Sequence, residues 1–426
     1  MNNSSAFARK GGFLAAVVGA AVCFVEPASA GAEVAKSTPT FLNSLGINAH
    51  VSLAQGPYSD VFALTGKLNY LGITHVRDDV RNTTASLARY QTLGSTGTKL
   101  TLMLSPKAVP DVDGALGALA PLAPFIDTLE GANEINVTPP VYGGYTGVPA
   151  AQAYQRKLWS SSKANPSFAT SSTLAQFTYG PVVVNPEGAG IADVGNVHLY
   201  PLLKQPPFYT IAMAAKTLGV PAHKYYLTEY NYATSTDANK GVSETVQAKY
   251  LLDGMFDATK IGFPRTYIYE VMDEGTLLSN PEFNFGLFHY DGTAKIAATA
   301  IHNLTQILGT GVTNPPQSFA PGALTYSISQ KLTLAFMDAN LYHLLLQGPN
   351  GTFYLVLWAE PPLYSGTTAI APPAPHPATI IFPSVHSDVQ VFDPLVGTTA
   401  ISDYPSTNSV TVSTTDHPII LAISNN

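Results

Sequence analysis

The chain of 426 residues has one cysteine, Cys23, which lies in an apolar segment near the N-terminus. A single cysteine forms no intramolecular disulfide and supplies no multi-thiolate metal site. If that segment is removed on export, the mature protein has no thiol to act as a nucleophile. The sequence therefore excludes a disulfide scaffold, a thiolate metal site and cysteine-based catalysis.

Charged residues are also scarce, at 12% of the chain, and Lys and Arg form no basic block. The formal net charge is −7. Binding to nucleic acid phosphates requires clustered basic side chains, so nucleic acid is not expected as a partner. The HExxH, P-loop and GxSxG patterns are absent, which removes the usual signals of zinc proteases, P-loop enzymes and serine hydrolases. We expect no metal ion and no cofactor.

Residues 1–30 have the pattern of an export signal. Arg9 and Lys10 precede the apolar stretch GFLAAVVGAAVCFV, and small residues follow at Ala28–Ser29–Ala30. This pattern predicts a signal peptide cleaved near Ala30 and a secreted or periplasmic protein. A membrane anchor is the alternative, but the stretch is short for a bilayer. No later apolar run is long enough to span a membrane. We also expect the protein to be a monomer.

Between residues 31 and 308, short apolar runs alternate with amphipathic helical patterns. Eight strands joined by crossovers predict a parallel sheet, and the length matches the roughly 250 residues of a (β/α)₈ barrel. An open doubly wound sheet is the alternative, but no glycine-rich dinucleotide loop follows the first strand. The predicted strands are 45–53, 73–80, 99–106, 123–129, 167–173, 192–201, 224–232 and 265–273.

From residue 309 the helical patterns stop. Short strands such as ALTYSISQ, FYLVLWAE and PIILAIS are separated by turns such as GPNG, and a Pro-rich loop lies within them. This pattern of short strands and turns predicts an antiparallel β-sandwich over residues 309–426. We expect it to be an accessory to the barrel.

Polar residues collect at the C-terminal ends of the predicted barrel strands, where barrel enzymes hold their active sites. Among them, Glu134 and Glu229 are 95 residues apart, which corresponds to three βα units of about 31 residues. They are therefore expected to face each other from strands four and seven. Retaining glycoside hydrolysis requires two carboxylates about 5 Å apart, one protonated and one ionised. The alternative is that both are exposed strand-end acids.

Three short motifs carry a family resemblance. GANE at 131–134, HLYP at 198–201 and LTEYN at 227–231 together resemble the clan A retaining glycosidases. The chain looks most like glycoside hydrolase family 39 and its bacterial exopolysaccharide-degrading relatives. The segment NFGLFHYDGTAKIAATAIHNL, followed by a sandwich, is also similar to that group. The resemblance implies a poly- or oligosaccharide substrate.

The resemblance also implies roles for individual residues. Glu134 is the expected general acid/base and Glu229 the expected nucleophile. Asn133 would bind the sugar 2-hydroxyl, and Tyr200 would donate a hydrogen bond to the nucleophile. Arg77 would keep Glu229 ionised, since a neighbouring cation lowers a carboxyl pKa.

The predicted substrate-binding set is completed by His198, which would line the sugar site, and by His50, Glu270 and Tyr269. Tyr269 is the expected stacking surface, because no tryptophan stands at the end of strand eight. Tyr230 is another departure, since the family usually has Trp there. We expect a structural, hydrogen-bonded role for Glu130.

Two features remain open at this point. Strand periodicity places Asn133 and Glu134 on opposite faces, so both reach one site only if the strand end is kinked or bulged. The function also has alternatives on the same scaffold. One is a transglycosylase that uses the same two glutamates, and the other is a catalytically inert polysaccharide-binding protein.

Overall fold

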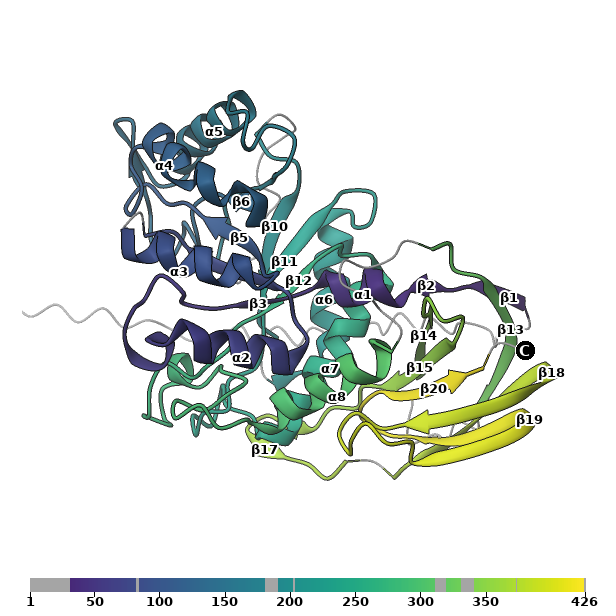
Figure 1. The fold of residues 1–426 in the computed structure, drawn as a ribbon. Coiled ribbons are helices and arrows are strands. Elements are labelled where there is room, and N and C mark those ends of the chain that lie inside the picture. Colours follow the sequence, from purple (N-terminus) through teal and green to yellow (C-terminus); the bar gives the residue numbers. More distant parts are fainter. Residues whose placement is uncertain are drawn as a thin grey trace, which may run out of the picture.

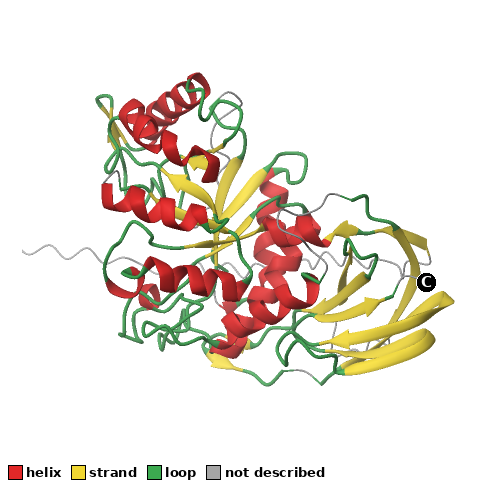
Figure 2. Ribbon diagram, in the orientation of Figure 1, coloured by secondary structure: helices red, strands yellow, loops and turns green. Residues whose placement is uncertain are grey.

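The computed structural model describes residues 31–81, 84–180, 191–201, 204–310, 319–330, 341–372 and 374–424. The predicted signal peptide, with Cys23, lies outside the described residues. The segment LTLAFMD at 332–338, which the sequence also predicts to be a strand, lies outside them too. A barrel surrounded by helices and a sheet-rich domain lie side by side (Figures 1 and 2).

Eight parallel strands form the barrel, as predicted. Their order in the sheet is β10-β11-β12-β3-β4-β5-β6-β9, and a parallel bridge between Ala175 and Val194 connects the two ends of this order. The strand bodies are buried, and polar residues are concentrated at their C-terminal ends. The strands are β3 (Leu45–Asn48), β4 (His75–Asp79), β5 (Lys99–Met103), β6 (Ile126–Glu130), β9 (Thr173–Ala175), β10 (Gly195–Leu199), β11 (Tyr225–Tyr230) and β12 (Thr266–Ile268).

Helices cover the outside of the barrel (Figure 2). Local sequence signals set their ends: the Asp60 carboxylate accepts bonds from the first N–H groups of α2, and Gly72 ends that helix in the left-handed conformation. None of the described helices is both long and apolar enough to cross a bilayer. The helices are α1 (Thr38–Ser44), α2 (Val61–Leu71), α3 (Thr84–Ser95), α4 (Val112–Leu119), α5 (Val148–Ala164), α6 (Pro207–Leu218), α7 (Glu244–Ile261) and α8 (Ile296–Leu308), with 3₁₀ turns η1 (Gly56–Tyr58), η2 (Ala120–Phe125) and η4 (Pro281–Phe283).

The fifth barrel strand was predicted too early in the chain. It was expected at 167–173, but β9 spans Thr173–Ala175 and the preceding residues form turns after α5. The N–H groups of Phe168 and Ala169 both donate to the carbonyl of Asn165, and the Asn165 side chain accepts from Ser167. Asn and Ser favour such local bonds over a strand ladder. Phe168 is buried, and its apolar character imitated a strand.

The C-terminal domain is antiparallel, as predicted, except where β14 pairs in parallel with β2. Its described strands are joined through hydrogen bonds into one sheet, in the order β1-β13-β18-β20-β15-β14-β2 with β19 beside β18. Residues from both ends of this order share one core. The strands are β1 (Gly31–Val34), β2 (Lys36–Ser37), β13 (Ala323–Gln330), β14 (Leu341–Gln347), β15 (Phe353–Ala359), β18 (His376–Phe392), β19 (Ser402–Thr414) and β20 (Ile419–Ile423). Two small hairpins are separate from both sheets: β7 (Val141–Tyr142) with β8 (Tyr145–Thr146), between β6 and α5, and β16 (Tyr364–Ser365) with β17 (Thr368–Ala369), between β15 and β18.

The N-terminal residues 31–37 belong to this sheet, whereas the sequence-based boundary at residue 31 grouped them with the barrel. β1 pairs with β13, and β2 pairs with β14. Both strands are too short to carry a readable apolar alternation, so their pairing is decided by contacts that are distant in sequence.

The central strands of this sheet are buried on both faces. In β15, Leu355 and Leu357 face the core of the sheet domain, whereas Val356 and Trp358 belong to the core cluster of the barrel. This alternation follows the two-residue period of a strand. The sheet lies against the side of the barrel that carries α7 and α8 (Figure 1). The two parts therefore share a continuous apolar contact.

This contact predicts one cooperative unfolding transition. Leu346 is fully buried and belongs to the barrel cluster, although it lies on β14 of the sheet domain. Leu346→Ala should lower the free energy of unfolding by about 2–5 kcal/mol and keep a single transition in urea. The control Val396→Ala, at a position that is 70% exposed, should change it by less than about 0.5 kcal/mol. Two separate transitions in the wild type would contradict the shared core.

Candidate active site

A cavity of about 970 Å³ opens at the C-terminal ends of the barrel strands. Its wall is built by residues at or just after the strand ends, as expected for a barrel enzyme. Of the predicted site residues, the cavity is lined by His50, Arg77, Asn133, Glu134, Tyr200, Glu229 and Tyr269. His198 and Glu270 are buried behind this wall, at 1% and 0% exposure.

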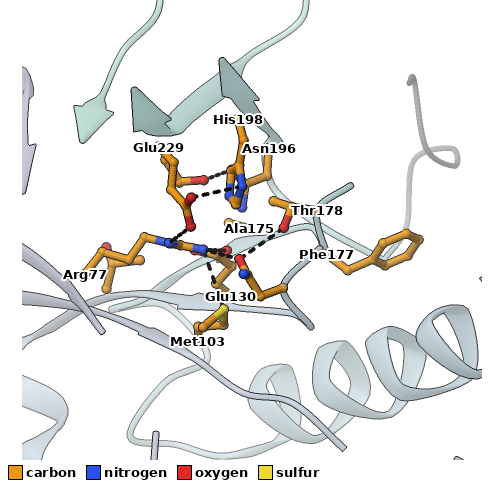
Figure 3. Close-up of polar contacts among 12 residues, drawn as sticks. Arg77, Met103, Glu130, Ala175, Phe177, Thr178, Asn196, His198 and Glu229 are labelled. Carbon is orange, nitrogen blue, oxygen red and sulfur yellow. Dashed lines mark hydrogen bonds and ion pairs between the residues drawn. The ribbon is translucent and has the colours of Figure 1, made fainter. Parts of the chain in front are cut away.

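Arg77, on β4, is the centre of a buried polar network (Figure 3). Its Nε and Nη2 donate to the two carboxylate oxygens of Glu130, each at 2.7 Å. Its Nη1 donates to Glu229 Oε1 at 2.8 Å, so one guanidinium joins strands four and seven. Asn48 Oδ1 and Asn133 Oδ1 accept two further bonds, at 2.8 and 2.9 Å, and Met103 Sδ lies 3.5 Å from Nη2. Glu130 is thus buried and hydrogen-bonded, as was expected for it.

Glu229, at the end of β11, is surrounded by groups that favour its ionised form. Burial alone would raise its pKa, but the charges of His198 and Arg77 outweigh burial and hold the pKa below its usual value. The Tyr200 hydroxyl donates to Glu229 Oε2 at 2.7 Å and acts in the same direction. The carboxylate is therefore ionised, oriented and 6% exposed at the cavity wall.

Glu134 reaches the same cavity through a kink in the chain. β6 ends at Glu130, and Glu134 has a φ of 38°, a left-handed value that is uncommon for a residue with a side chain. Its N–H donates to Thr178 Oγ1 at 2.9 Å, which holds the kink. The two-residue alternation of a strand therefore does not extend to these residues. Both Asn133 and Glu134 line the cavity.

The two glutamates meet at His198. Its Nδ1 lies 2.8 Å from Glu134 Oε1 and 3.3 Å from Glu229 Oε2. One oxygen of each glutamate and the His198 nitrogen all lie within 4.8 Å of one another. Among the described residues, Glu134 has no counterpart to the polar network on Glu229, and its side chain is 20% exposed. The two carboxyl groups therefore have unequal surroundings in one cavity.

A second cluster connects strands one and eight. His50 Nε2 lies 3.1 Å from Glu270 Oε2 and 2.7 Å from Glu274 Oε1, and the Tyr58 hydroxyl donates to Glu270 Oε2 at 2.8 Å. Burial raises the pKa of Glu270 to about 7, and His50 opposes that rise. Burial also disfavours the charged form of His50, but the two carboxylates raise its pKa well above the usual value.

Solved structures of family 39 glycoside hydrolases share this architecture. No family model and no curated protein matches the sequence. A family 39 glycoside hydrolase from the gut symbiont Bacteroides cellulosilyticus WH2 superposes with a TM-score of 0.61 at 15% identity, over 91% of this chain and 82% of that one. The chain has the fold of family 39 glycoside hydrolases. The predicted resemblance is thus confirmed at the level of fold.

Two further solved structures cover almost the whole chain. The GH39 enzyme from Xanthomonas axonopodis pv. citri has a TM-score of 0.57 at 11% identity, over 92% of this chain and 96% of that one. A monomeric beta-xylosidase from Caulobacter crescentus CB15 has a TM-score of 0.55 at 12% identity, over 92% and 97%. Both the barrel and the sheet domain therefore belong to the shared fold.

The departures from the family 39 motif pattern have a structural explanation. Tyr230 is fully buried and points away from the cavity, since its hydroxyl donates to the backbone carbonyl of Tyr250 on α7. Tyr269 instead lines the cavity and makes edge contacts with Tyr200 and Phe285, at ring-centroid distances of 6.3 and 5.6 Å. This aromatic trio supplies an apolar wall without tryptophan.

Four residues of the site were not predicted from the sequence. Asn48 binds Arg77, Thr178 holds the kink at Glu134, and Glu274 and Phe285 line the cavity. Asn48 is the last residue of β3 and lies inside the predicted strand 45–53, so a polar residue in an apolar run was a usable signal. The other three lie in loops, where sequence gives no register.

Three side-chain groups of the described residues have a spacing that a metal ion could use: His50 with Glu270 and Glu274, His50 with Asp78 and Asp79, and Glu134 with His198 and Glu229. Ion pairs and hydrogen bonds already account for these positions. In particular, Asp78 accepts bonds from the Ser52 N–H and the Tyr90 hydroxyl, both at 2.7 Å. The geometry gives no reason to invoke an ion.

The Arg77–Glu130 pair predicts a large effect on stability. Glu130→Gln leaves a fully buried guanidinium with one carboxylate partner fewer, and removing one member of a buried pair costs on the order of 3–5 kcal/mol. Urea unfolding near pH 6 measures the change. The control is Asp113→Asn, which breaks the solvent-exposed Lys157–Asp113 pair and should change stability little. Equal effects of the two substitutions would contradict the proposed importance of the buried pair.

Proposed function

We propose that this chain is an exported retaining glycoside hydrolase that cleaves O-glycosidic bonds in a poly- or oligosaccharide without a cofactor. The observation that carries the proposal is the pair Glu134 and Glu229, whose nearest oxygens are within 4.8 Å in one cavity. Retaining enzymes hold their two carboxyl groups about 5–5.5 Å apart, whereas inverting enzymes leave about 6.5–9.5 Å for a water molecule. The close spacing favours double displacement.

In this mechanism Glu229 is the nucleophile. Its ionised carboxylate attacks the anomeric carbon, and Glu134 donates a proton to the departing glycosidic oxygen. In the second step Glu134 accepts a proton from water, which attacks the same carbon. The bond to Glu229 breaks, the carboxylate is restored, and the sugar leaves with retained configuration. The ion pair with Arg77 keeps Glu229 ionised before the first step, and the more exposed Glu134 can exchange its proton.

The remaining cavity residues would bind the sugar. Asn133, held by Arg77, is positioned for the 2-hydroxyl, and Tyr269 offers an aromatic surface to the ring. His50, supported by Glu270, would bind a hydroxyl on the opposite side. The similar beta-xylosidase makes xylosides a first substrate to test. Turnover of saccharides in a broad panel tests the proposal itself, and binding without turnover would favour an inert polysaccharide-binding protein.

The two glutamates should respond differently to removal. Glu134→Ala should lose on the order of 10²–10⁴-fold in rate on a natural glycan but retain glycosylation by an activated aryl glycoside, whose leaving group needs no proton. Glu229→Ala should lose activity on both substrates, because no covalent bond can form. Asp79→Ala, at a cavity carboxylate without an assigned role, is the control.

Added azide then distinguishes the roles. In Glu134→Ala it should attack the covalent intermediate and give a product of retained configuration, whereas in Glu229→Ala it should attack the sugar directly with inversion. NMR of each glycosyl azide gives the configuration. Swapped configurations would reverse the two assignments, and near-normal turnover by Glu229→Ala without azide would exclude this residue as nucleophile.

The pH profile should also follow from the site. Activity requires ionised Glu229, so kcat/KM falls as pH drops through a pKa that lies below the usual 4.5. The mechanism also requires a protonated general acid, so kcat/KM should fall again at higher pH, which gives a bell shape. Tyr200→Phe removes one bond to the carboxylate and should move the acidic limb to higher pH. Tyr209→Phe, at a position that is 61% exposed, should leave it unchanged. A flat profile would contradict this account.

A further inference from the structure

Three carboxyl groups lie buried between the barrel and the sheet domain. Asp253 and Asp257 are four residues apart on α7, so they share one face of that helix. Glu360 directly follows β15 of the sheet domain. Their exposures are 0%, 0% and 5%. None of them belongs to the candidate active site, so the inference drawn from them is independent of the proposed function.

Few donors reach these carboxyl groups. The Trp358 indole N–H is shared between Asp257 Oδ1 and Glu360 Oε1, at 3.1 and 3.0 Å. The Phe208 N–H donates to Glu360 Oε2 at 2.8 Å. Among the described residues, both oxygens of Asp253 and Oδ2 of Asp257 have no hydrogen-bond partner. An ionised carboxylate in such a place would be strongly unfavourable.

The charged side chains next to the cluster form ion pairs with other residues. Lys249, one turn before Asp253 on α7, pairs with Asp416 at 2.6 Å, and Asp416 also contacts His417 at 3.0 Å. No basic side chain of the described residues is within ion-pair distance of Asp253, Asp257 or Glu360. The cluster therefore contains three acids and no paired cation.

The tyrosine hydroxyls near the cluster also form hydrogen bonds with other groups. The Tyr230 hydroxyl donates to the carbonyl of Tyr250, and the Tyr232 hydroxyl donates to the carbonyl of Gln205. The Tyr250 hydroxyl lies 3.4 Å from the carbonyl of Pro361 and accepts from the Leu363 N–H at 2.9 Å. These hydroxyls therefore donate to backbone carbonyls and not to the three acids.

We propose that Asp253, Asp257 and Glu360 form a proton-binding latch: protonated, they hold the barrel and the sheet domain together, and their ionisation at higher pH loosens that contact. A protonated acid can donate where the cluster lacks donors, and Trp358 lies between an acid from each domain. The ligand of this site is thus the proton, and the latch acts across the interface between domains.

The titration direction agrees with this geometry. Burial raises the pKa of Asp253 and Asp257 well above the usual value, and it raises the pKa of Glu360 to about 7. In the unfolded chain these groups ionise near the ordinary carboxyl pKa of about 4. Stability from the cluster is therefore complete below about pH 4 and is lost as pH rises through the folded-state values, because the unfolded state then binds fewer protons than the folded state.

The test combines thermal unfolding with tryptophan fluorescence across about pH 4 to 9. This range covers the carboxyl pKa of the unfolded chain and the raised pKa of the folded protein. The full-length protein should unfold at temperatures that fall by at least about 5 °C over this range. Asp253→Asn and Glu360→Gln imitate the protonated acids and should each flatten the fall. The control Asp111→Asn removes an exposed carboxylate at the N-cap of α4, where Asn caps equally well, and should keep the wild-type slope.

Fluorescence reports on the latch directly. The chain has two tryptophans, so Trp159→Phe leaves Trp358 as the single reporter. Its emission should shift with a midpoint near pH 7, and Glu360→Gln should abolish that shift. A pH-independent emission together with an unchanged slope in both neutral variants would overturn the proposal. Stabilisation at high pH by Ca²⁺, abolished in Asp253→Asn, would overturn it in favour of a cation site. If Asp253→Asn fails to fold, the unfolding slope of Glu360→Gln and the Trp358 emission test the proposal.

Discussion

The buried guanidinium of Arg77 is the constraint on which the candidate site depends. An arginine that is 3% exposed must be matched by carboxylates and amide oxygens, and the barrel supplies them from three strands and the loop after β6. Glu130 takes two of its N–H groups, so Glu229 receives a single charge-assisted bond and remains accessible at the cavity wall. The same arginine fixes Asn133, and it therefore positions both a candidate sugar ligand and the candidate nucleophile.

The sheet domain supports the barrel wall that carries this site. β14, β15 and β20 bury one face in their own core and the other against the barrel, which makes the two parts mechanically continuous. Tyr230 follows Glu229 on β11 and is anchored to α7, and α7 also carries Asp253 and Asp257 of the interface cluster. Changes in that cluster thus act on the helix that supports the strand of the candidate nucleophile.

Much of the fold could be predicted from the sequence, because alternating strand and helix patterns are local signals. The spacing of Glu134 and Glu229 was informative for the same reason, since βα units have a regular length. The fifth strand was misplaced because Phe168 is buried in a turn, and the pairing of residues 31–37 with the sheet domain depends on distant contacts. Other features arise only when the chain is folded, so no local sequence pattern predicts them. They are the positive φ of Glu134, its hydrogen bond to Thr178 and the burial of Glu360.

The central claim is that Glu229 forms a covalent bond to the sugar, and trapping that bond tests it most directly. A 2-deoxy-2-fluoro glycoside of a sugar that the protein turns over should inactivate it and add one fluorosugar mass. Peptide mass spectrometry should locate that mass on Glu229, and the label should be absent when Glu229 is replaced by Gln. A label on Glu134, or turnover of the natural substrate with inversion and no trapped adduct, would contradict the account.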